Sequence, residues 1–143
     1  MIRLYSPFNP CRGWLVLIMD DTINELSSRI IGAAIEVHKT LGPGLLESAY
    51  EECLCYDLEE RGIAFERQLP ITINYKDHAI DCSYRIDILV ENTIVIELKA
   101  VDRIEPIHQA QLLTYLKLSE KKLGLLINFN VPLLKEGIIR LVN

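Results

Sequence analysis

The sequence has little of what zinc modules, membrane proteins and free-standing polyanion binders require. Its four cysteines form no CxxC pair and no Cys/His spacing typical of a zinc site. Its longest apolar run near the N-terminus, residues 15–19, is far shorter than the ~20 residues of a membrane-spanning helix. A net charge of −5 provides no bulk cationic field, so any polyanion must meet a local patch or a bound cation. We therefore expect reduced thiols, no membrane partner and a cytoplasmic location.

Motifs of several common enzyme classes are absent too. The chain has no GxxxxGK[ST], GxGxxG or GxSxG segment, which disfavours P-loop, dinucleotide-binding and hydrolase-elbow chemistry. Its three histidines, His38, His78 and His108, are isolated, which favours capping, turn or surface roles over catalysis. The chain does have 143 residues, of which 50% are hydrophobic, and this is enough for one globular domain with its own core.

The first residues differ in texture from the rest of the chain. Residues 1–19 contain Pro7, Pro10 and Gly13 and lack the period of a helix or strand. Clean periodicity begins only after Met19. We expect residues 1–19 to be an N-terminal appendage that need not belong to the native domain, and residues 20–143 to form that domain.

Hydrophobic periodicity predicts an α/β (α+β) domain with one mixed sheet flanked by helices. The predicted helices span 22–41, 45–60 and 106–119, and the predicted strands span 63–67, 71–75, 80–90, 93–100, 123–129 and 137–142. The first four strands are expected to form an antiparallel meander because short turn segments separate them. The predicted order is α-α-β-β-β-β-α-β-β.

Two neighbouring strands carry the strongest local signal. Alternation places their apolar residues on one face, namely Ile86, Ile88 and Val90 on the first strand and Ile94, Ile96 and Leu98 on the second. Matching these faces sets Val90 opposite Ile94. The same register places Asp87 opposite Glu97, with Lys99 next along on the charged face.

This charged face has two interpretations. Adjacent carboxylates repel unless one is protonated or a cation lies between them, and oxygen ligands at this spacing suit Mg²⁺ or Mn²⁺. The Leu98 carbonyl is then a further ligand, and Lys99 is placed to orient an attacking water or to neutralise charge on a phosphoryl oxygen. The alternative is a solvated face with cross-strand ion pairs of about 0.2–1 kcal/mol each. Leu89 and Val95 share this face, which favours a covered site.

Three motifs together resemble a known family. Residues 44–50, Gly-Leu-Leu-Glu-Ser-Ala-Tyr, fit the signature of the GxxExxY proteins. Asp87 with residues 97–99 fits the D…ExK pattern, and residues 111–115 fit the QxxxY pattern, of the PD-(D/E)xK nucleases in which that family is placed. The resemblance covers about residues 22–143, with Ile86 where the superfamily name has Pro. It implies a restriction-endonuclease-like core and a Mg²⁺- or Mn²⁺-dependent nuclease acting on nucleic acid.

The resemblance also gives roles to two helical residues. Glu47 borders the apolar stripe of its helix. Taken from the residues alone, it is a first-turn Glu that the helix dipole stabilises. The resemblance implies instead that it is a metal ligand, directly or through water. Gln111 is either an amide tying helix to sheet or, by the resemblance, one that orients a phosphate or a site carboxylate with support from Tyr115. The candidate catalytic residues are thus Glu47, Asp87, Glu97, Lys99 and Gln111, and the candidate metal ligands are Asp87, Glu97, Leu98 and Glu47.

Two other functions stay open. The acidic net charge and small size favour a catalytically silent nuclease-fold module for binding or assembly. A metal-dependent hydrolase of a small phosphate ester or nucleotide is the third interpretation. Nucleic acid is the expected partner of the nuclease, and a protein partner or a second copy of the chain is expected for the assembly module.

Overall fold

The computed structural model describes the backbone of residues 10–143 and the side chains of residues 21–143 except Ser83. Its elements are α1 (Pro10–Leu41), α2 (Glu47–Glu60), β1 (Phe65–Tyr75), β2 (His78–Val90), β3 (Ile94–Lys99), α3 (Pro106–Ser119), β4 (Leu123–Asn128), the 3₁₀ helix η1 (Leu134–Gly137) and β5 (Ile138–Val142). The predicted appendage, residues 1–19, lies outside the described side chains.

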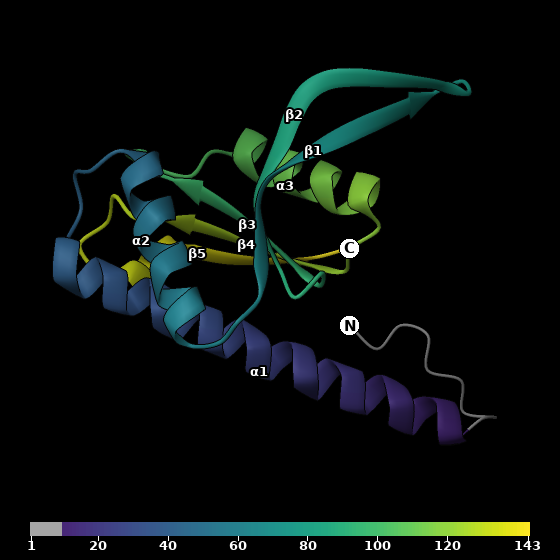
Figure 1. Ribbon diagram of the computed structural model, residues 1–143, viewed down its shortest axis with the longest axis horizontal. Coiled ribbons are helices and arrows are strands. Elements are labelled where there is room, and N and C mark those ends of the chain that lie inside the picture. Colours follow the sequence, from purple (N-terminus) through teal and green to yellow (C-terminus); the bar gives the residue numbers. More distant parts are fainter. Residues whose placement is uncertain (1–9) are drawn as a thin grey trace.

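One mixed sheet in the order β1-β2-β3-β4-β5 organises the described chain (Figure 1). The first three strands form the predicted antiparallel meander, α3 crosses over so that β4 runs parallel to β3, and β5 returns antiparallel to β4. The predicted α/β (α+β) fold class is confirmed.

Two predicted boundaries are wrong. The first helix, expected over 22–41, begins at Pro10 and so takes in part of the segment that was expected to lack a helical period. The strands expected at 63–67 and 71–75 are a single strand, β1, so three strands precede α3 and not four. Pro70, which has no N–H to donate within a sheet, lies between the two expected segments. It lies on the edge strand of this sheet, where the missing donor costs no pairing, and it still pairs with Arg85. The ladder is irregular only at Gln68, which forms no pair, and between Ile71 and Thr72, where the register shifts.

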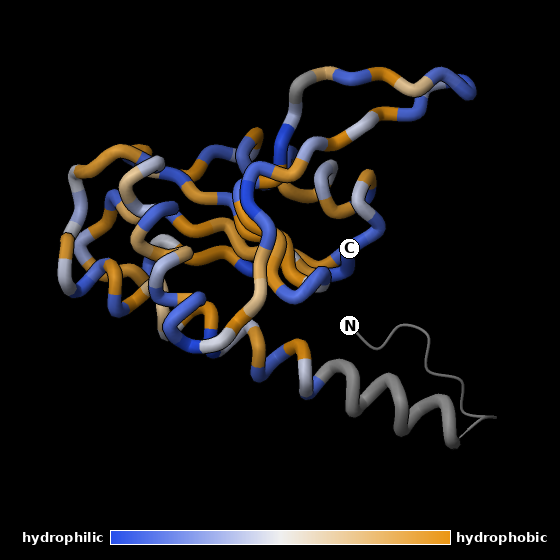
Figure 2. Tube along the Cα trace, in the orientation of Figure 1, coloured by the Kyte–Doolittle hydropathy of each residue, from blue (hydrophilic) through white to orange (hydrophobic). Residues whose placement is uncertain are grey.

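Two hydrophobic cores lie on opposite faces of the sheet. The larger core joins α1 and α2 to the sheet through residues such as Ile30, Leu54, Ile88, Ile96 and Leu125. The smaller core joins α3 to the other face through Leu89, Val95, Leu112, Leu116 and Leu126. The hydrophobic stretches therefore concentrate in the strands between the helices (Figure 2), and β4 is buried along its whole length. Leu89 and Val95 are covered, as the sequence predicted for the charged face.

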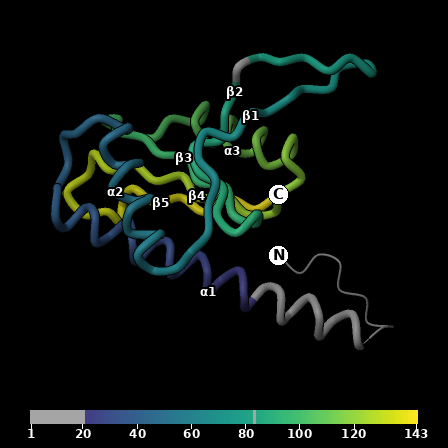
Figure 3. The backbone as a smooth tube through the Cα atoms, viewed as in Figure 1, coloured from purple at the N-terminus to yellow at the C-terminus, as the bar shows by residue number. Residues whose placement is uncertain are grey.

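The β1–β2 hairpin bends away from the body of the sheet (Figure 3). Ile86 was predicted to share a face with Ile88 and Val90, and this is wrong, because Ile86 packs in the α3-side core with Ile71. Strict alternation holds only while the strand stays in the plane of the sheet. The outer half of the hairpin leaves that plane and projects as an arm, so its base forms one wall of the region beside Asp87.

A single tyrosine fixes the start of α2. Gly42, at a φ of 68°, ends α1, and the α2 helix begins at Glu47. The hydroxyl of the fully buried Tyr50 donates to the Gly42 carbonyl at 2.5 Å and accepts from the Leu45 N–H at 3.2 Å. Its ring stacks on Phe129 at 4.3 Å between centroids. Tyr50 is therefore a packing residue, and it holds Glu47 at a defined place.

Candidate active site

Strands β2 and β3 separate where the predicted carboxylates lie. The ladder pairs Val90 with Ile94 and ends at Ile88 and Ile96, which confirms the predicted register. At the next position the side chains replace backbone pairing: the Asp87 N–H donates to Glu97 Oε1 at 3.1 Å, and the Leu98 N–H donates to Asp87 Oδ2 at 2.9 Å. The two carboxylates are thereby held next to each other.

Both carboxylates are withdrawn from water. Glu97 is 4% exposed and Asp87 is half-buried. Burial, together with the neighbouring Asp87 charge, raises the pKa of Glu97 to about 8, against the opposing effect of its hydrogen bond from the Asp87 N–H. Burial also raises the pKa of Asp87, and the Leu98 N–H opposes this. The pair therefore resists carrying two negative charges without a cation.

Lys99, at the end of β3, is held by a chain of contacts from α3. Its Nζ donates to Gln111 Oε1 at 3.4 Å, and Gln111 Nε2 donates to the Tyr115 hydroxyl at 2.9 Å. Burial raises the pKa of Tyr115, with a further contribution from the Glu97 charge. The structure thus brings Gln111 to Lys99 and Tyr115 rather than to a carboxylate.

Helix α2 contributes two acidic residues to the same region. Glu47 is exposed in the first turn, and Glu51 is 9% exposed one turn later on the same helix face. Glu51 Oε2 accepts from Arg67 Nη2 at 2.9 Å, and its Oε1 accepts from Gln68 Nε2 at 2.7 Å. The sequence analysis missed Glu51, and its spacing of four residues from Glu47 is the signal that could have found it.

All of the candidate residues line one cavity of ≈ 320 Å³. Its lining consists of Glu47, Ser48, Glu51, Gln68, Arg85, Asp87, Glu97, Leu98, Lys99, Gln111 and Tyr115. Besides Glu51, the sequence analysis did not place Ser48, Gln68 or Arg85 there. Four carboxylates thus face two cationic side chains, so the cavity is predominantly acidic.

The donor set fits a hard divalent cation. A cation placed at Asp87 and Glu97 would relieve the unfavourable burial of their charges, and carboxylate oxygens are ligands that Mg²⁺ accepts. Among the side chains described from residue 21 onward, no three His, Cys, Asp or Glu residues form a metal-binding cluster. Mg²⁺ commonly binds through only one or two carboxylates, with water and substrate phosphate completing its shell. Two carboxylates are therefore sufficient for this type of site.

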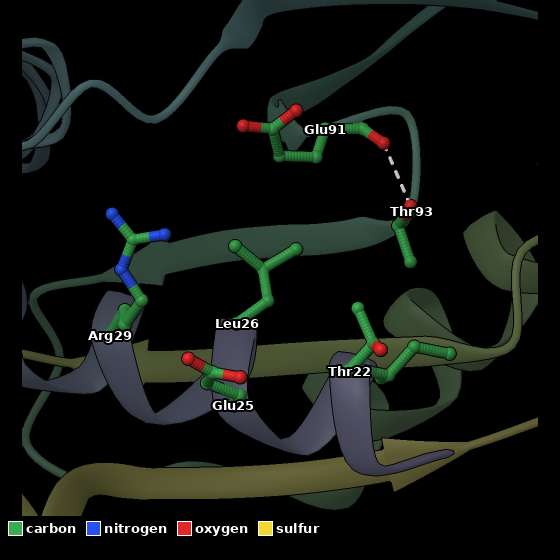
Figure 4. A pocket seen from close by; sticks show the side chains of 7 residues that line it. Thr22, Glu25, Leu26, Arg29, Glu91 and Thr93 are labelled. Atoms are coloured by element: carbon green, nitrogen blue, oxygen red, sulfur yellow. Dashed lines mark hydrogen bonds between the residues drawn. The ribbon is translucent and has the colours of Figure 1, made fainter. Parts of the chain in front are cut away.

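A second cavity, of ≈ 490 Å³, lies between α1 and the β2–β3 turn (Figure 4). Its labelled side chains surround Leu26, and the Thr93 hydroxyl donates to the Glu91 carbonyl at 2.7 Å. The acidic side chains Glu25 and Glu91 are exposed there, unlike Glu97. The smaller cavity is the better candidate because it alone of these two holds desolvated, facing carboxylates.

The three histidines and the three cysteines with described side chains lie outside the candidate cavity. His38 Nε2 is hydrogen-bonded to the Val131 carbonyl at 2.8 Å, and His108 Nδ1 accepts from the Glu105 N–H at 2.9 Å in the N-terminal cap of α3. His78 is exposed at the start of β2. Cys53, Cys55 and Cys82 are free thiols. Within residues 10–143, no helix has both the length and the hydrophobicity to cross a bilayer.

Comparisons with known proteins identify the family. Residues 24–141 match the family model of the PD-(D/E)XK nuclease superfamily. Searches of curated proteins and of solved structures gave no significant match. The matched segment contains α2, the β2–β3 pair and α3, which together supply the five candidate catalytic residues. The chain therefore belongs to the PD-(D/E)XK nuclease superfamily.

Proposed function

We propose that this protein is a Mg²⁺- or Mn²⁺-dependent nuclease of the GxxExxY group that hydrolyses phosphodiester bonds in DNA or RNA. The observation that carries the proposal is the desolvated Asp87 and Glu97 pair with Lys99 beside it in one cavity. Superfamily membership supports the same reaction class. We also propose a cytoplasmic location, in keeping with the free thiols.

Asp87 and Glu97 are the proposed ligands, with the Leu98 carbonyl as a third oxygen donor. Glu47 lines the same cavity and would act on the cation through water. A bound divalent cation supplies positive charge for a phosphoryl oxygen and lowers the pKa of a coordinated water. This charge is needed because the cavity residues alone would repel a phosphodiester.

The proposed role of Lys99 is to orient the attacking water and to neutralise charge developing on the scissile phosphate. Its ammonium is half-buried and is held at one position by Gln111. Tyr115 fixes the orientation of the Gln111 amide through the second hydrogen bond. We assign Gln111 as a positioning residue, because it acts on the reaction through Lys99.

A cleavage assay on labelled single-stranded and double-stranded DNA and RNA, with Mg²⁺ or Mn²⁺, tests the proposal. Asp87→Asn and Lys99→Ala should each lower cleavage at least about a hundredfold, because each removes a group from the reacting centre. The matched controls are Asp102→Asn and Lys122→Ala, whose side chains are exposed outside the cavity. Cleavage that survives both site substitutions unchanged would contradict the proposal.

A catalytically silent binding or assembly module is the second candidate. The net charge of −5 and the predominantly acidic cavity favour it. Calorimetric titration with Mg²⁺ and Mn²⁺ distinguishes the two functions by metal affinity. A nuclease should bind the ion, and Asp87→Asn should weaken that binding. Tight protein binding or self-association, without metal binding or cleavage, would favour the module. Cleavage of mononucleotides but not of polynucleotides would favour a small phosphate-ester hydrolase.

A further inference from the structure

An interruption of the β1–β2 ladder lies directly beside Asp87. Arg67 pairs with Ile88 and Leu69 with Ile86, whereas the residue between them, Gln68, is left out of the ladder opposite Asp87. Gln68 has a φ of 51°, which is uncommon for a residue with a side chain. Because Gln68 forms no ladder pair, its carbonyl can accept a hydrogen bond from a side chain.

Side-chain contacts hold Gln68 in this conformation. Its Nε2 donates to the buried Glu51 carboxylate at 2.7 Å, which anchors it to α2. Its carbonyl accepts from Arg85 Nη1 at 3.3 Å. The interruption therefore orients a guanidinium that lines the cavity with Asp87 and Glu97.

Arg85 differs from the other arginine near the site. Arg67 is neutralised by ion pairs to Glu51 at 2.9 Å and to Glu52 at 2.7 Å. Arg85 forms no ion pair with any of the described residues, and its side chain is exposed. A guanidinium has five N–H donors, so most of them remain available after one hydrogen bond to a carbonyl. Such a group suits a bidentate contact to a phosphate.

We infer that Arg85, held by the Gln68 carbonyl, forms a phosphate subsite that binds the backbone phosphate next to the one that is cleaved. Arg85 and Asp87 lie two positions apart on β2, or about 6–7 Å along the strand, which is on the scale of one nucleotide step. Occupation of this subsite requires a substrate with at least two phosphates. The inference rests on the proposed nuclease function and makes a polynucleotide its substrate class, in preference to a mononucleotide.

The test compares two substrates with Mg²⁺ or Mn²⁺: a single-stranded oligonucleotide and bis(p-nitrophenyl) phosphate, which has one phosphate. For the oligonucleotide, Arg85→Gln should raise KM about tenfold with little change in kcat, because the subsite binds substrate outside the reacting centre. The slope of log affinity against log salt should fall by about 0.7, which is the value for one phosphate contact on a single strand. With bis(p-nitrophenyl) phosphate, the kcat/KM of the variant should equal that of the wild type.

Two further variants make the result specific. Arg103→Gln removes the same charge from a side chain that is 81% exposed outside the cavity, and it should leave both substrates unaffected. Arg85→Lys keeps the charge without the bidentate geometry and should give an intermediate KM. Thermal unfolding of each variant checks that the fold is intact.

The possible failures are distinguishable. An Arg85→Gln variant that cleaves the oligonucleotide with the wild-type KM, or that loses activity equally on both substrates, overturns the subsite and leaves the nuclease proposal standing. A wild-type protein that cleaves neither substrate with either metal overturns the proposed function, and the subsite with it.

Discussion

Replacing Glu97 by glutamine should remove a pH-dependent loss of stability from the metal-free protein. In the folded protein, burial raises the pKa of Glu97 from 4.5 to about 8. The folded state therefore keeps a proton that the unfolded state releases near its lower pKa. Since the folded state binds more protons across this interval, the free energy of unfolding falls as pH rises from about 4.5 to about 8.

The structure sets the size of this effect. The difference between 4.5 and about 8, at about 1.4 kcal/mol per pKa unit, corresponds to at most about 5 kcal/mol. Glu97 is 4% exposed, so solvent screening reduces this value little. Glutamine keeps the oxygen that accepts the Asp87 N–H and has no charge to desolvate. The free energy of unfolding of the Glu97→Gln variant should therefore vary less with pH than that of the wild type.

Urea denaturation in the presence of a chelator, at about pH 5 and about pH 8, measures the effect. The wild type should lose several kcal/mol more than Glu97→Gln between these conditions. Titration of groups far from Glu97 cancels in the comparison, whereas the difference includes the effect of the Glu97 charge on Asp87. Glu60→Gln is the control, because this residue is exposed at the end of α2. Parallel pH dependences for the wild type and Glu97→Gln would refute the reasoning. Under the proposed function, Mg²⁺ should stabilise the wild type at the higher pH more than it stabilises Glu97→Gln.

Three further substitutions test individual contacts. Gln111→Leu should lower kcat about tenfold with little change in KM, because it removes the acceptor that positions Lys99; steady-state cleavage kinetics measure this. Arg67→Ala should lower the free energy of unfolding by about 2 kcal/mol in urea denaturation, because it leaves the buried Glu51 carboxylate without its cation. The loss is not larger because Arg67 is itself partly exposed. Tyr50→Phe should cost about 1–2 kcal/mol in the same assay, because it removes the two hydrogen bonds that the Tyr50 hydroxyl forms with the loop before α2.

Local patterns were sufficient to predict the strand pair that carries the candidate site. The register that sets Val90 opposite Ile94 followed from apolar alternation alone, because a slip of one residue would expose every apolar side chain on that strand. Alternation did not predict the face of Ile86, because the side to which this side chain points depends on where the hairpin bends. That bend coincides with the end of the β2–β3 ladder, a feature that a pattern within one strand does not contain.

The residues that were missed depend on contacts between distant segments. Glu51 on α2 is stabilised by Arg67 and Gln68 on β1, so its burial could not be predicted from the stripe of its own helix. The merging of two predicted strands across Pro70 depends on β1 being at the edge of the sheet. Edge position is a property of the whole topology, and no local sequence pattern specifies it.

The carboxylates of Asp87 and Glu97 also join two strands that have lost their backbone pairing. Selection for a stable sheet would therefore retain a side-chain oxygen acceptor at positions 87 and 97, from a carboxylate or from the corresponding amide, in a descendant that had abandoned hydrolysis. Such a descendant has no structural reason to keep Lys99, because the long hydrogen bond from Lys99 to Gln111 does not link the two strands. Within this lineage a lysine at position 99 should therefore mark the working enzymes better than an oxygen-bearing side chain at positions 87 and 97 does.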